Sequence, residues 1–161
     1  MTIGPVDGPI VSVIPGLIDA LIARAADALP DRVVADGFHT GADAADFLEV
    51  GVEDPDLTGF TTSADSAQSW AHATGRGRDE EGDLACAAVS WSTDGDPRAA
   101  RQAAFETVAA VSAIIHADPT IGGVPGLLWT VFGARLEYHH GQTDDGAVAQ
   151  VLFQIHYRAR L

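Results

Sequence analysis

The sequence contains a single cysteine and no long apolar run, and these two absences exclude several classes of protein. Cys86 is the only thiol in 161 residues, so neither an intrachain disulfide nor a cysteine-based zinc framework can form. No stretch approaches the roughly 20 uninterrupted apolar residues of a membrane helix, so no membrane partner is expected. The apolar fraction of 47% is ordinary for a globular domain with its own core.

Lysine is absent as well, and the charge is strongly of one sign. All 9 basic residues are arginine, against 23 acidic residues, and the formal net charge is −14. The arginine bias is typical of a GC-rich coding genome, and a salt-loving source is the second interpretation. A negative protein does not bind nucleic acid tightly and non-specifically, because like charges repel and no counterions are released. The charge is compatible with a protein past which DNA slides without sticking.

The first residues lack the features of a targeting signal. Residues 1–9 hold no basic residue and no signal-peptide h-region, so we expect a protein that is cytosolic or is assembled in the host cytoplasm. Glycine and proline predict a flexible arm over residues 1–11. An apolar 3.6-residue period then predicts a helix that begins near Ser12 and stops at Leu29.

Alternating polar and apolar residues predict strands on both sides of a second helix. This helix has an Asp96-Pro97 start, an apolar stripe and an Asp118-Pro119 end. The predicted strands cover residues 32–35, 46–52, 66–73, 84–92, 127–138 and 147–160, with loops over 74–83 and 139–146. The expected fold is α+β and forms one domain over residues 1–161. It has an antiparallel or mixed sheet of about four to six strands, with two main helices packed on one face.

A search for catalytic, cofactor and metal sites finds no motif with the required spacing. The neighbouring His139 and His140 have no third ligand at a metal-binding distance along the chain. The run 75–78 lacks the ending of a phosphate-binding loop, and Gly122-Gly123 is not part of a dinucleotide fingerprint. We therefore expect no enzyme, no cofactor and no metal, and interpret Cys86 as a buried structural thiol.

Three stretches in a fixed order carry a resemblance to a known family. The first runs from Trp70 through the charged segment 76–80 into the apolar segment 84–92, and the second joins residues 94–97 to Arg101 and an alanine-rich helix. The third covers residues 118–123, a hairpin and a closing Tyr-Arg-Ala-Arg-Leu. In order and spacing, these stretches resemble the tail terminator (tail completion) proteins of long-tailed, siphovirus-type bacteriophages, especially those of actinobacterial hosts.

The resemblance implies a non-enzymatic virion protein that forms a homo-hexameric ring on the last ring of the tail tube. Such a ring stops tail polymerisation, provides the docking surface for the head–tail connector, and encloses the channel through which phage DNA passes without specific binding. It also implies a place at the head-proximal end of the tail. The implied partners are the major tail tube protein and the connector (neck) protein.

Exposure and charge suggest which residues make these contacts. A charged, mobile loop is the predicted partner-contact site, and it holds Arg76, Arg78, Asp79, Glu80 and Glu81. A second set is predicted at the interface between subunits: Trp70, Trp91, Arg98, Arg101, Tyr157 and Arg158.

Three other interpretations stay open at this point. A head–tail connector (neck) or minor tail protein is also a small α/β ring former. A small cellular α+β enzyme or ligand-binding domain would need a deep pocket with convergent polar groups. A host-encoded structural protein of a phage-derived particle would share the same physics.

Overall fold

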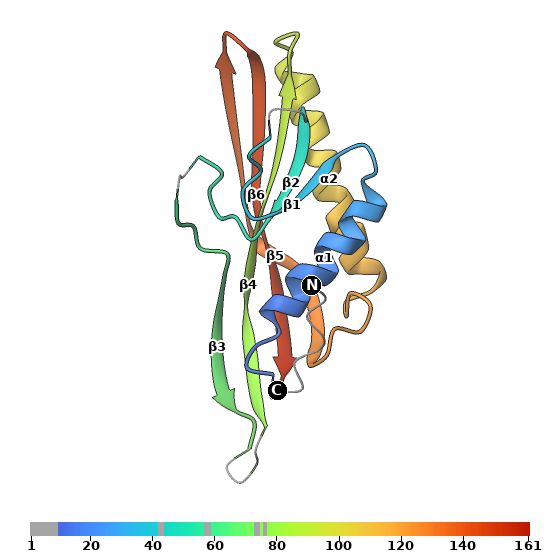
Figure 1. Cartoon of the computed structure of the whole chain (residues 1–161), viewed down its shortest axis with the longest axis vertical. Coiled ribbons are helices and arrows are strands. Elements are labelled where there is room, and N and C mark those ends of the chain that lie inside the picture. Colours follow the sequence, from blue (N-terminus) through green and yellow to red (C-terminus); the bar gives the residue numbers. More distant parts are fainter. Residues whose placement is uncertain (1–9, 42–43, 57–58, 73–74, 76) are drawn as a thin grey trace, which may run out of the picture.

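Helices and strands alternate along a chain that the computed structural model describes over residues 10–41, 44–56, 59–72, 75 and 77–161. The order is α1 (Ile14–Ala28), β1 (Val33–Asp36), β2 (Asp46–Val50), β3 (Ala64–Trp70), β4 (Arg78–Ser92), α2 (Pro97–Ala117), β5 (Leu127–Thr143) and β6 (Gly146–Arg160). The long strands β4, β5 and β6 run along the long axis, and both helices lie on one side (Figure 1). The predicted α+β class is confirmed, with two helices and a six-stranded mixed sheet.

The long strand β4 has different neighbours along its two halves. The path β1-β2-β4-β6-β5 forms the main sheet, and β3 pairs with β4 off this path. β2 pairs with residues 86–90 of β4, whereas β3 pairs with residues 78–84. Among the described residues β1 and β2 run parallel, and the other strand pairs are antiparallel. The strands β3 and β5 therefore lie at opposite edges of the half of the sheet that contains the start of β4.

The two helices pack their apolar sides into one core with the sheet. At the start of α2, the Asp96 carboxylate accepts a hydrogen bond from the Arg98 amide at 2.9 Å, as its predicted capping role requires. α1 begins at Ile14, close to the start predicted near Ser12, but Val13 and not Ser12 is the N-cap residue; the Ser12 hydroxyl accepts a hydrogen bond from the Ile14 amide at 3.1 Å. The core includes Leu17, Leu21, Leu84, Cys86, Val108, Val111, Val151, Phe153, Ile155 and Tyr157. Within the described ranges, no helix has both the length and the apolar character needed to cross a membrane.

The segment between β2 and β3 lies against the other face of the sheet. The Gly51 amide donates to the Ala85 carbonyl at 2.8 Å, and the Ala85 amide donates to the Ser63 carbonyl at 2.9 Å. The Gln150 side chain donates to Asp56 at 3.0 Å. The backbone bonds tie both ends of this segment to β4 at Ala85, and the Gln150 bond places Asp56 over the sheet face away from the helices.

Two of the predicted loops are wrong in part, because strands continue through them. Residues 78–83 form the first part of β4, between β3 and β6, although the sequence suggested a mobile loop over 74–83. Likewise β5 and β6 continue to a two-residue turn at Asp144-Asp145. Residues 78–83 are rich in charged side chains, as exposed loops are, but in the sheet these side chains pair with side chains of β6. The predicted arm residues 1–9 and the loop residues 73, 74 and 76 lie outside the described part of the chain.

Candidate assembly surfaces

Acidic side chains of β4 face basic side chains of β6 on the sheet face away from the helices. The Asp79 carboxylate accepts hydrogen bonds from Arg160 at 2.7 and 3.1 Å, and an Arg158 nitrogen lies 3.4 Å away. The Arg160 hydrogen bond is the main cause of a lowered pKa of Asp79. We refer to six side chains as the charged ladder: Asp79, Glu81, Asp83, His156, Arg158 and Arg160.

His156 lies in the middle of the charged ladder, between two carboxylates. Its Nε2 is 3.0 Å from Glu81 and its Nδ1 is 3.1 Å from Asp83. Partial burial lowers the pKa of His156, but the hydrogen bonds and attraction of Glu81 and Asp83 together outweigh this effect and raise the pKa above its usual value. The Trp129 ring lies 5.6 Å from the imidazole ring. The folded state therefore favours the imidazolium form.

Glu80 points to the opposite face of β4 and is fully buried. Its carboxylate accepts hydrogen bonds from the Ser12 hydroxyl at 2.6 Å, the Val13 amide at 3.1 Å and the Tyr157 hydroxyl at 3.0 Å. Burial is the first cause, and the bond to Glu80 the second, of a raised pKa of Tyr157. The predicted contact roles of Glu80 and Tyr157 are therefore wrong, because neither side chain reaches the surface. They form an internal site that holds the start of α1.

The other predicted contact residues are spread over the molecule. Trp70 is 71% exposed at the end of β3, and Arg78 next to it donates to the Gln68 side chain at 3.0 Å. Arg98 and Arg101 are exposed on α2. The other predicted positions are Arg76, outside the described residues, and Trp91, which lines a hollow of about 530 Å³. No single site brings the predicted set together within the described residues.

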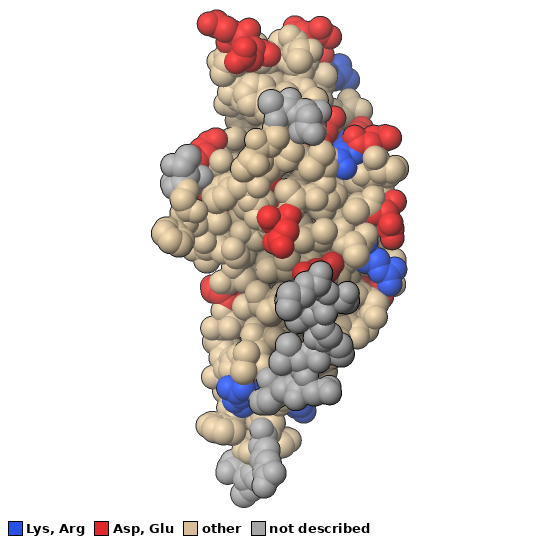
Figure 2. All heavy atoms as spheres, viewed as in Figure 1, with Lys and Arg blue, Asp and Glu red and all other residues tan. Residues whose placement is uncertain are grey.

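The two ends of the molecule differ in charge. Acidic side chains crowd the upper end in Figure 2, where the β5–β6 turn and the start of α2 lie, and arginines lie near the lower end. The upper end holds Asp94, Asp96, Asp144 and Asp145 together with Arg98, and the lower end holds Arg78 and Arg160 together with Asp79, which pairs with Arg160. Any partner stacked along the long axis therefore meets a different charge at each end.

No arrangement typical of catalysis was found in the described part of the chain. Cys86 is buried, and this burial raises the pKa of the thiol to about 12. Glu49 is a second buried carboxylate, whose pKa is raised by desolvation and which accepts a hydrogen bond from the His39 amide at 2.7 Å. The described ranges contain no group of three or more His, Cys, Asp or Glu side chains arranged to hold a metal.

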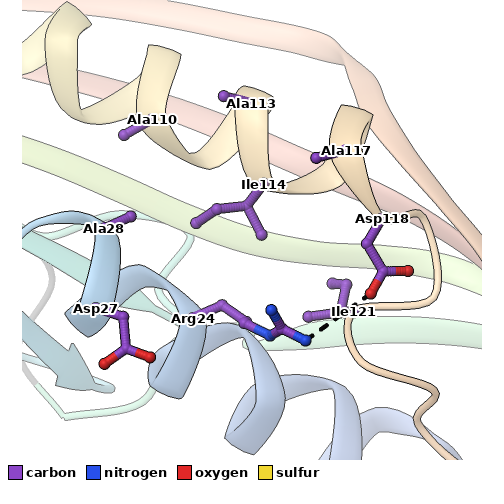
Figure 3. Close-up of a pocket in the computed structure, with 9 residues that line it drawn as sticks. All are labelled: Arg24, Asp27, Ala28, Ala110, Ala113, Ile114, Ala117, Asp118 and Ile121. Carbon is purple, nitrogen blue, oxygen red and sulfur yellow. Dashed lines mark ion pairs between the residues drawn. The ribbon is translucent and has the colours of Figure 1, made fainter.

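Apolar surface is the feature that sequence reasoning missed. Phe60 is 99% exposed in the segment between β2 and β3, and Val11 is 69% exposed before α1. All residues of β3 after Ala64 are exposed, so this strand has no buried face. A groove of about 580 Å³ lies between α1 and α2, with an apolar lining and the Arg24–Asp118 pair at its rim (Figure 3). These features suit contacts with another macromolecule.

Comparisons with known proteins link the fold to a phage-like particle. No protein-family model matches the sequence, and no curated protein is similar to it. Among solved structures, the fold is similar to that of a chain in the virion of a native gene transfer agent (GTA) particle, with a TM-score of 0.55 and 14% sequence identity. The likeness covers 94% of this chain and 100% of that chain. At this identity the match establishes a shared fold.

Proposed function

We propose that this chain is a structural, non-enzymatic virion protein of a tailed phage or phage-like particle. The observation that carries the proposal is the shared fold, which extends over nearly all of this chain and all of a chain from a gene transfer agent virion. Two independent features agree with it. The sequence resembles tail terminator proteins, and the described surface offers apolar side chains for contacts with partners instead of a catalytic site.

The specific role we propose is that of a tail terminator. Six copies form a ring on the last ring of the tail tube, end tail polymerisation and provide the docking surface for the head–tail connector. The net charge of −14 suits the wall of a channel through which DNA passes without adhesion. The ends of the molecule, one acidic and one rich in arginine, provide different surfaces for the tube and the connector.

Of the partner-contact site that the sequence suggests, we retain only some of the residues. Arg78, Asp79 and Glu81 belong to the end of the molecule where β4 begins. Glu81 is exposed and Arg78 is partly exposed, whereas the Asp79 side chain is 18% exposed and is held by Arg160. Arg158 of β6 and Trp70 of β3 lie at the same end, and in our proposal they keep the role at the interface between subunits that the sequence suggests. The charged side chains of β4 at this end contact a neighbouring ring.

The test is polymerisation of the tail tube protein from the same genome, with and without this chain. We expect the chain to bind tube ends and to shorten the tubes seen by negative-stain electron microscopy, and native mass measurement to show six copies on each end. Unchanged tube length together with binding to the portal-side adaptor would instead identify a neck protein. Tubes of unchanged length, together with no binding to tube ends or to the portal-side adaptor, would contradict a role at the head–tail junction.

A further inference from the structure

The outer edge of β3 has no strand beside it. Over Ala64–Trp70 this strand pairs only with β4 among the described residues, and Figure 1 shows it at the margin of the lower half of the sheet. Neither of its faces is buried. Such an edge presents a row of unpaired N–H and C=O groups, which favours pairing with another strand.

Two backbone bonds fix which residues of this strand face the open edge. The Ala85 amide donates to the Ser63 carbonyl at 2.9 Å, and the Ala71 amide donates to the Gly77 carbonyl at 3.0 Å. Because positions in an antiparallel pair alternate between hydrogen-bonded and non-hydrogen-bonded, the odd-numbered residues turn their backbone groups toward β4. The even-numbered residues of 64–70 therefore turn theirs toward the open edge.

The other open edges of the described sheet do not match this strand. β5 lies level with β3 over residues 127–132, where the Pro119 carbonyl accepts the Thr130 amide at 2.8 Å and so occupies the edge. β1 has only 4 residues, against 7 in β3. The β3 strand of a second copy has both the matching length and an open edge.

Full overlap of two antiparallel β3 strands fixes their register, with Ala67 opposite Ala67 of the second copy. The outward-facing positions then coincide in the two strands, so that N–H groups meet carbonyl groups. Asp65, the only charged residue of the strand, lies opposite Ser69. The Trp70 ring, 71% exposed in the single copy, lies opposite the small Ala64. No like charges are opposed in this register, and like charges directly opposite each other would destabilise it.

β3 also separates the acidic side chains of the two copies. The carboxylates of the charged ladder lie on β4, one strand further in. At about 4.8 Å between neighbouring strands, the β4 strands of two paired copies lie roughly 14 Å apart. This distance exceeds the screening length of about 10 Å at 0.1 M salt, so the repulsion between the two sets of carboxylates is weak.

We infer that two copies of this chain pair through β3, as antiparallel strands related by a two-fold axis at Ala67. The pairing extends the sheet across both copies and covers both open edges. The inference goes beyond the proposed function, because a cyclic ring contains only head-to-tail contacts. The two-fold contact therefore belongs to copies outside the ring, where it keeps the open edge from pairing with other proteins before assembly.

Disulfide formation tests the register, because the only native thiol is buried and this burial raises its pKa to about 12. In the paired dimer, Ala67→Cys brings two identical thiols to a non-hydrogen-bonded pair, with a Cα separation of about 4.5 Å that a disulfide can span. Ser69→Cys is the matched control, since it is exposed on the same face but lies roughly 13 Å from its counterpart along the strands. We expect Ala67→Cys to form disulfide-linked dimers at least roughly ten times faster under a mild oxidant.

Charge substitutions test the same register without a covalent bond. Ala67→Lys places two ammonium groups opposite each other, whereas Ser69→Lys places each one opposite Asp65 of the other copy. Both variants change the net charge equally. Sedimentation velocity should show that Ala67→Lys raises the dissociation constant of the dimer roughly fivefold, and that Ser69→Lys leaves it unchanged or lowers it. Both positions are exposed, so thermal unfolding should match the wild type.

Three outcomes would overturn the pairing. They are equal disulfide rates for Ala67→Cys and Ser69→Cys, equal changes of the dissociation constant for the two lysine variants, and a wild-type chain that stays monomeric at every concentration tested. The proposed function is tested separately, by the length of tail tubes. If the pairing is confirmed but tubes grow unchanged, the pairing stands and the terminator role fails. If the chain is monomeric alone yet shortens tubes, the pairing is wrong and the terminator role stands.

Discussion

Glu80 shows how one buried carboxylate can organise the start of a helix. It accepts three hydrogen bonds, from Ser12, Val13 and Tyr157, while its own strand lies nearly 70 residues away from α1 in sequence. The first turn of α1 has no acidic residue, so Glu80 supplies the negative charge that the positive end of the helix dipole favours. The same residue therefore links β4, β6 and α1.

We predict that Glu80→Ala lowers the free energy of unfolding by about 2–3 kcal/mol, because the Val13 amide and the Tyr157 hydroxyl lose their buried acceptor. Urea unfolding followed by circular dichroism gives this value. Asp19→Ala is the control, since this carboxylate on α1 is exposed and its loss should cost less than about 0.5 kcal/mol. If both variants lose the same free energy of unfolding, the buried hydrogen bonds of Glu80 contribute no more to stability than an exposed carboxylate does.

A second prediction at the residue scale concerns His156 and pH. The raised pKa means that the folded state holds the proton more tightly than the unfolded chain does. The resulting stabilisation is fully present below the ordinary pKa of about 6.5 and is lost as pH rises through the higher folded-state value. We expect the urea midpoint of the wild type to fall across this range, and the midpoint of His156→Gln to fall less. If the urea midpoints of the two proteins change equally with pH, the raised pKa of His156 does not contribute to stability.

Among the elements, β3 is unusual because neither of its faces is buried. It is held to the sheet by pairing with residues 78–84 of β4, and the backbone of β3 lies close to Gly82. A Cβ on Gly82 would lie 1.9 Å from the Asp65 carbonyl oxygen, so the two backbones can adopt this spacing only with glycine. The sequence of β3 also lacks the lysine, proline and bulge with which edge strands are usually protected.

We predict that Gly82→Ala detaches β3 from β4 and leaves the rest of the sheet folded. Hydrogen exchange should show lost protection of the Ala67 and Ser69 amides, with β5 and β6 unchanged. Gly77→Ala is the control, because its Cβ would meet only ordinary contacts, the nearest at 3.6 Å. Retained protection of β3 in Gly82→Ala would mean that the strand shifts to accept the methyl group.

The elements differ in how well the sequence predicts them, and the difference is physical. The start of α2 is encoded locally by Asp96 and Pro97, and the structure confirms it. The first half of β4 is not encoded locally, because Asp79 and Glu81 find their partners in β6, more than 70 residues later. The buried site of Glu80 and the α1–α2 groove depend on how distant elements pack. No local pattern contains that information.

At the scale of the whole molecule, the charge and the apolar surface have opposite effects on assembly. Each copy carries a net charge of −14, so neighbouring copies repel, while Phe60 and Trp70 favour contact. Raising the salt from about 0.1 M to about 1 M shortens the screening length from roughly 10 Å to 3 Å. The repulsion between whole copies is thereby weakened, whereas the burial of apolar surface is not.

We therefore predict that self-association of this chain becomes stronger with salt. Sedimentation velocity at about 0.1 M and about 1 M NaCl should show a larger fraction of oligomer at the higher concentration. Phe60→Ser should reduce the oligomer fraction at both concentrations yet keep the same direction of salt dependence, since it removes apolar contact and leaves the net charge unchanged. The opposite trend, dissociation by salt, would show that ion pairs dominate the contact.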